Sequence, residues 1–61
     1  MSYTAEEKLE AIQREISMRR AVYGRRVTES KMTQRQAEKQ IGLFEEIAAD
    51  YEKLAEQERL L

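Results

Sequence analysis

The side chains that could do chemistry in this 61-residue sequence are carboxylates, amines, guanidiniums and hydroxyls, because it contains no histidine and no cysteine. These two residue types supply most zinc, haem and thiol-nucleophile sites. Carboxylates do recur four residues apart, as Glu46 with Asp50 and Glu52 with Glu56. Di-metal helical bundles combine such carboxylates with histidine, which is missing here. We therefore expect a solvated acidic face, no catalytic residue, no metal site, no cofactor, and a protein that is not an enzyme.

Basic residues offer a second kind of chemistry, the recognition of anionic surfaces. Residues 14–39 contain eight basic and three acidic side chains, a net charge of +5, whereas residues 1–13 carry −2 and residues 40–61 carry −4. A basic cluster of this kind can meet nucleic-acid phosphates or an acidic protein surface. The candidate partner-binding patch consists of Arg19, Arg20, Arg25, Arg26, Lys31, Arg35 and Lys39.

The same charge segregation also has a structural interpretation, namely ion pairing between two antiparallel helices, and we give this interpretation precedence. Five opposite-charge pairs would lie at matching heights: Lys8–Glu56, Glu10–Lys53, Arg14–Asp50, Arg19–Glu45 and Arg25–Glu38. Exposed pairs contribute only ~0–1 kcal/mol each, so they would fix the register more than the stability. The basic residues left without a partner are Arg20, Arg26, Lys31, Arg35 and Lys39.

Two amphipathic helices position these charges. Thr4 with Glu7, and Thr33 with Gln36, have the spacing of capping boxes, in which each side chain bonds the other residue's backbone N–H. Helical periodicity lapses only in residues 27–33. We predict a single domain, 1–61, with helices at about 5–29 and about 34–60 joined by a turn at about 30–33.

One apolar series on each predicted helix has the spacing of a helix–helix seam. When the chain is folded back at the turn, facing residues have numbers that sum to 63 or 64, as in Val27 with Ala37. We predict an all-α, antiparallel two-helix hairpin with coiled-coil-like packing, in which Arg19 or Arg20 fills one seam position and Gly24 and Gly42 allow close backbone approach. The series are Ala5, Leu9, Ile12, Ile16, Tyr23 and Val27, and Ala37, Ile41, Phe44, Ala48, Tyr51 and Ala55.

A second apolar stripe lies beside this seam and has nothing to cover it within one hairpin. A homodimer that forms a four-helix bundle would bury the stripe, and we expect this outcome because symmetric pairs are the commonest soluble oligomers. The alternative is docking of an unrelated protein against the stripe. Its residues are Ala11, Met18, Val22, Leu43, Ile47 and Leu54, followed by Leu61.

Other functional classes find little support in the sequence. No apolar run approaches the ~20 residues that span a bilayer, and the start of the chain lacks a signal-type apolar segment. We therefore expect a cytoplasmic protein without membrane contact. A small-molecule substrate is not expected, because a helical hairpin offers no concave pocket.

Residues 19–51 carry motifs that resemble those of short, mostly uncharacterised proteins encoded by bacteriophages and prophages. The motifs are Arg19-Arg20-Ala21-Val22-Tyr23, Lys31-Met32-Thr33 and the segment 46–51, together with Val27, Ala37 and Ile41. The resemblance implies a small accessory factor in the bacterial host cytoplasm that acts by contact and carries no transferable site. Size and architecture are also similar to the plasmid-copy-control protein Rop, by fold analogy alone.

These observations together favour a homodimeric helical hairpin that binds and modulates a protein partner. The alternative is a nucleic-acid-binding regulator that uses the basic residues near the turn. A structural component of a phage particle is the third possibility.

Overall fold

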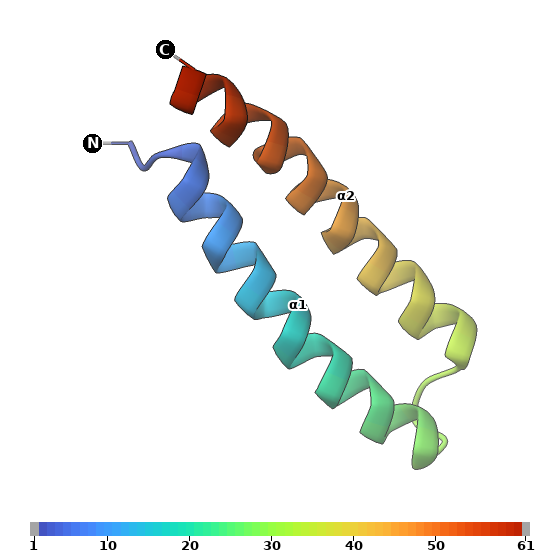
Figure 1. Cartoon of the computed structure of the whole chain (residues 1–61). Helices are drawn as coiled ribbons and strands as arrows, with labels where there is room; N and C mark the ends of the chain where they lie inside the picture. The colour runs from blue at the N-terminus through green and yellow to red at the C-terminus, as the bar shows by residue number, and fades with distance from the viewer. Residues whose placement is uncertain (1, 61) are drawn as a thin grey trace.

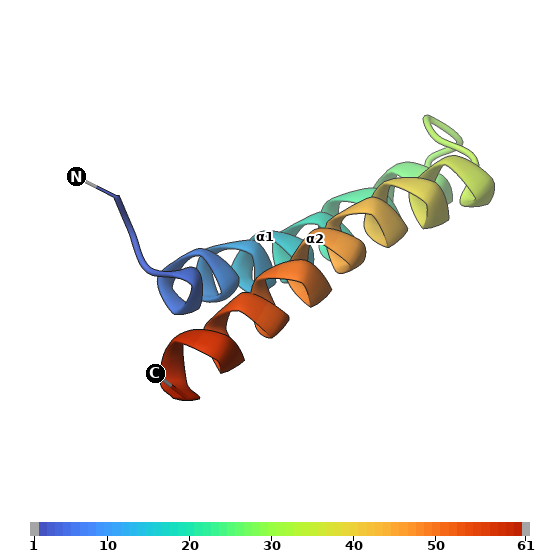
Figure 2. The same cartoon turned by 90° about the horizontal axis from the view of Figure 1, so that it is seen from above.

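The computed structural model describes residues 2–60, which form two helices, α1 (Ala5–Thr28) and α2 (Gln34–Leu60). The helices run antiparallel and side by side, with the turn at one end and both chain ends at the other (Figure 1). Seen from above, they form a single layer (Figure 2), and the molecule measures 47 × 18 × 15 Å. The predicted all-α hairpin is confirmed, and Leu61 of the second apolar stripe lies outside the described residues.

Both helices start at the predicted capping boxes. The Thr4 hydroxyl accepts from the backbone N–H of Glu7 at 3.1 Å, and the Glu7 carboxylate accepts from the N–H of Thr4 at 3.1 Å. Thr33 and Gln36 exchange the equivalent bonds at 3.1 and 3.0 Å. These bonds satisfy backbone donors that have no partner within the first helical turn, which explains why each helix begins where it does.

The turn closes α1 without a glycine. Ser30 has φ of 61°, and its N–H donates to the Val27 carbonyl while the N–H of Lys31 donates to the Arg26 carbonyl. This pair of bonds is the Schellman motif, which requires a left-handed residue and usually contains glycine there. Ser30 therefore holds a strained conformation at the point where the chain reverses direction.

The seam between the helices contains the residues that the sequence pattern assigned to it. Ala5, Ile16, Tyr23, Ala37 and Ala55 are buried, and the other seam residues are half-buried. Three of the five buried residues are alanines, so the interior of one hairpin removes little apolar surface from water. Small domains with such a limited core usually depend on oligomerisation or another added source of stability.

The end that carries both chain ends is closed by a contact between the helices. The Glu58 carboxylate, near the end of α2, accepts from the backbone N–H of Ala5, the first residue of α1, at 3.1 and 3.3 Å. A negative charge opposes the dipole at the end of its own helix but suits the positive N-terminus of α1. The contact gives Glu58 a structural role that its position in α2 alone does not explain.

Candidate interaction surface

One broad side of the helix pair exposes a group of apolar side chains, which we call the apolar face: Ala11, Met18, Val22, Leu43, Ile47 and Leu54. Met18 is 63% exposed, Leu43 48%, Ile47 40% and Leu54 46%. Ala11 is also exposed, whereas Val22 is half-buried at the edge of the seam. The predicted second stripe thus reaches solvent in the hairpin.

The two halves of the apolar face lie on the same side of the molecule. On each helix the stripe is offset from the seam in the same rotational sense, and antiparallel helices with equal offsets present their stripes to one side. The residues fall into three pairs whose numbers each sum to 65: Ala11 with Leu54, Met18 with Ile47, and Val22 with Leu43. An uncovered apolar surface with this degree of order is typical of a protein-contact site.

The predicted ion pairs across the helices are not formed. Within residues 2–60, none of the five predicted pairs comes within ion-pair distance. Arg20, which the prediction left without a partner, instead contacts Glu45 of α2 at 2.5 Å. Lys31 contacts Glu29 within the turn at 3.1 Å. Cross-helix pairing therefore does not explain why basic residues gather near the turn.

The sequence predicts that either Arg19 or Arg20 fills one position of the seam, and in the structure Arg19 fills it. Its guanidinium binds Glu15 one turn earlier on α1, and it lies 5.8 Å from the centre of the Phe44 ring, within cation–π range. The hydrogen bond from Arg19 to Glu15 and the charge of that carboxylate raise the pKa of the Arg19 guanidinium above its usual value. Arg19 thus acts mainly within the hairpin and contributes little to a free basic surface.

Four other members of the basic patch remain available to an external partner. Arg25, Arg26, Arg35 and Lys39 are exposed, and none forms an ion pair with the described part of the chain. Together with Lys31 they surround the turn, which Figure 1 places at the end of the molecule opposite both chain ends. We call this set the basic turn end.

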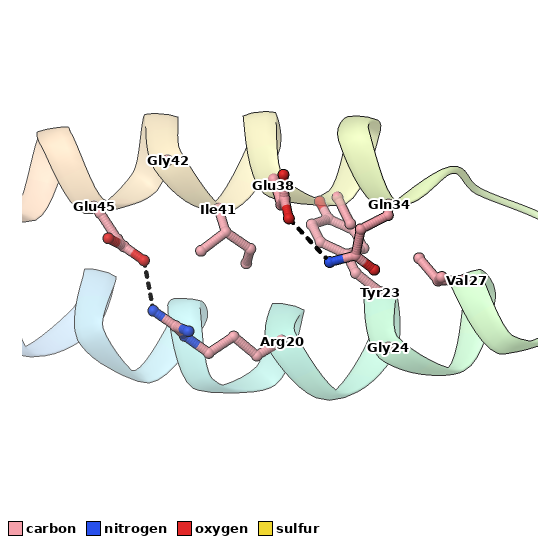
Figure 3. A pocket seen from close by; sticks show the side chains of 10 residues that line it. Arg20, Tyr23, Gly24, Val27, Gln34, Glu38, Ile41, Gly42 and Glu45 are labelled. Carbon is pink, nitrogen blue, oxygen red and sulfur yellow. Dashed lines mark hydrogen bonds and ion pairs between the residues drawn. The ribbon is translucent and has the colours of Figure 1, made fainter.

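The side opposite the apolar face carries a hollow that was not predicted. Gly24 and Gly42 lie beside it, its volume is about 380 Å³, and Arg20, Glu38 and Glu45 are among its lining residues (Figure 3). A Cβ atom placed on either glycine would meet no atom within 4 Å. The expected role of these glycines in close backbone approach is therefore wrong. The absence of their side chains opens a hollow at the surface, which also corrects the expectation that a hairpin offers no concave region.

Two further features concern metals and membranes. Within residues 2–60, no three acidic side chains are grouped closely enough to hold a metal ion. Neither described helix combines the length and apolar character that crossing a membrane requires.

The chain matches no protein-family model, no curated protein and no solved structure.

Proposed function

We propose that this protein is a non-enzymatic interaction module, a homodimeric helical hairpin that binds and modulates a protein partner. The observation that carries the proposal is the apolar face, where four large side chains are at least 40% exposed. Fully burying an exposed apolar side chain of this size contributes about 1.5–3 kcal/mol, and covering these partly exposed side chains contributes a fraction of that amount each. A second copy packed against this face supplies the missing layer and yields a four-helix bundle.

Two variants test the homodimer: one introduces a negative charge on the apolar face, and the other introduces a negative charge outside it. Ile47→Glu places a carboxylate in the middle of the apolar face and should convert the dimer to a monomer. Ala49→Glu is the matched control, because Ala49 is exposed on the same helix but lies outside the apolar face. Light scattering and circular dichroism on both variants separate loss of dimer from loss of helix. A dimeric Ile47→Glu variant contradicts the proposal.

The proposed contact for the protein partner is the basic turn end, which would meet an acidic surface. Complementary charge speeds association and selects among partners more than it adds affinity. The variant Lys31→Glu should reduce capture of a partner from bacterial extract without changing the dimer mass. Lys53→Glu, with Lys53 on the acidic half of α2, serves as the charge control. Equal capture by all three proteins excludes the basic turn end as the contact.

Nucleic-acid binding is the second candidate function, and the exposed basic residues without an ion pair favour it. Such binding depends steeply on salt, because each neutralised phosphate releases counterions. The described aromatic side chains argue against base stacking, since Tyr23 is buried and Phe44 and Tyr51 are half-buried. Only Tyr3, which is 72% exposed, is free to stack. For this reason the protein partner is preferred.

The cellular setting belongs to the same proposal. The motifs at residues 19–51 support a phage-type accessory protein that acts in the cytoplasm of a bacterial host. The third possibility, a structural component of a phage particle, is distinguished by its location. Such a component is recovered in purified phage particles, whereas an accessory factor is not.

A further inference from the structure

We infer that the two copies in the homodimer lie antiparallel, with the turn of each copy beside the chain ends of the other. This inference rests on the proposed homodimer and adds the orientation of the second copy. The apolar face alone does not define that orientation, because its three residue pairs could meet a second copy pointing either way. The distribution of unpaired charge along the molecule does define the orientation.

Within residues 2–60, exposed charges without an ion pair are predominantly basic toward the turn, with Glu38 as an exception, and predominantly acidic toward the chain ends, with Lys8, Lys53 and Arg59 as exceptions. Arg25, Arg26, Arg35 and Lys39 lie toward the turn, whereas Glu6, Glu10, Glu52 and Glu56 lie toward the chain ends. None of these eight side chains forms an ion pair within the described residues. The long dimension of the molecule, 47 Å, is several times the ~8 Å Debye length at physiological salt, so one copy cannot satisfy them internally.

An antiparallel second copy brings each basic end beside an acidic end. The opposite orientation, with both turns together, places two net basic ends side by side and two net acidic ends side by side. Complementary potentials across an interface favour the first arrangement. Lys31 lies in the turn, beyond the ends of both helices, so it remains available to a protein partner.

The position of the apolar face permits this orientation with full overlap. Ile47 is the middle residue of α2, and its pair Met18 lies close to the middle of α1. A two-fold axis perpendicular to the helices near this level sets each helix against its own copy. It places Ala11 opposite Val22, and Leu43 opposite Leu54, so that apolar residues still meet apolar residues across the interface.

Arg25 distinguishes the two orientations. In the antiparallel dimer it lies across from Glu7 of the second copy, since the two residues are five helical turns apart on one flank of α1. With both turns together, it lies across from Lys39 of the second copy. Arg25→Glu should therefore weaken an antiparallel dimer about two- to five-fold in dissociation constant at low salt, an effect in the range of exposed ion pairs. A tighter dimer overturns the inference.

A distance between two spin labels gives the decisive test. The chain has no cysteine, so Ser30→Cys introduces one label site in the turn. At ~1.5 Å per residue, the antiparallel dimer separates the two labelled turns by about 40 Å. Helices that pack about 8–10 Å apart bring the two turns within about 20 Å in the other orientation. The long distance supports the inference and the short distance overturns it.

Ser17→Cys provides the matched control, because Ser17 lies near the middle of α1 and gives a short distance in either orientation. A short distance from Ser17→Cys with a short distance from Ser30→Cys overturns only the orientation. A monomeric mass together with no dipolar signal from either site overturns the homodimer, and the proposed function fails with it.

Discussion

The carboxylate of Glu58 accepts hydrogen bonds from the backbone N–H of Ala5, which joins the last turn of α2 to the first residue of α1 across 53 positions of sequence. This relationship explains an acidic residue at a helix end where its own dipole disfavours it. It also fixes the end of the hairpin farthest from the turn, which would otherwise separate most easily.

Replacing Glu58 should destabilise the hairpin. Glu58→Gln keeps the shape but removes the charge at the N-terminus of α1, and we expect a loss of about 1 kcal/mol in the free energy of unfolding. Urea denaturation followed by circular dichroism measures this change. Glu56→Gln, two residues earlier and without a hydrogen bond to α1, is the control and should have little effect. Equal losses in the two variants would show that the contact with Ala5 contributes nothing.

The turn should accept glycine with a gain in stability. Ser30 has φ of 61°, where an L-residue is strained and glycine is not. We expect Ser30→Gly to raise the free energy of unfolding by about 0.5–1 kcal/mol, and Ser30→Val to lower it, because a β-branched side chain is the least compatible with this conformation. Thermal melting of the three proteins ranks them. A ranking with valine above serine is incompatible with the left-handed turn.

Gly24 and Gly42 should also be replaceable by alanine. A Cβ atom at either position meets nothing within 4 Å, and alanine is favoured over glycine in a helix by about 0.5–1 kcal/mol. Each substitution should therefore stabilise the chain and partly fill the hollow in Figure 3. Denaturation by urea provides the measurement. Destabilisation by alanine would mean that a neighbour approaches these glycines in the assembled protein.

The ion pair between Arg20 and Glu45 should contribute little. Both side chains are more than half exposed, and exposed pairs are worth about 0–1 kcal/mol. A double-mutant cycle with Arg20→Ala and Glu45→Ala should return a coupling energy below about 1 kcal/mol that disappears at high salt. A coupling that persists in molar salt would indicate that the pair is shielded from solvent, as in an interface on that side.

The two helices and the seam between them can be predicted from the sequence because both depend on local rules. The helix starts are predicted by the capping boxes of Thr4 with Glu7 and of Thr33 with Gln36. The regular apolar spacing assigns Ile16 and Tyr23 to the interior. The lapse in helical periodicity predicts the position of the turn. Its left-handed serine was not foreseen, since glycine is the usual signal for that conformation.

Contacts between long side chains were predicted less well. Matching height along the two helices predicts a pair of Arg19 with Glu45, but Arg19 binds Glu15 on its own helix, where residues four apart are neighbours. That leaves Glu45 to Arg20. The contact between Glu58 and Ala5 could have been found, because their numbers sum to 63, the register of the seam. Pairing of opposite charges does not reveal it, because the donor in α1 is a backbone N–H and not a basic side chain.

The mass of the unmodified chain in solution tests the homodimer most directly. Light scattering over a range of protein and salt concentrations should give twice the 7.2 kDa of one chain, and an added mixture of DNA and RNA should not change that mass at moderate salt. A particle that stays at 7.2 kDa at every concentration contradicts the homodimer and leaves the apolar face as a docking site for a different protein.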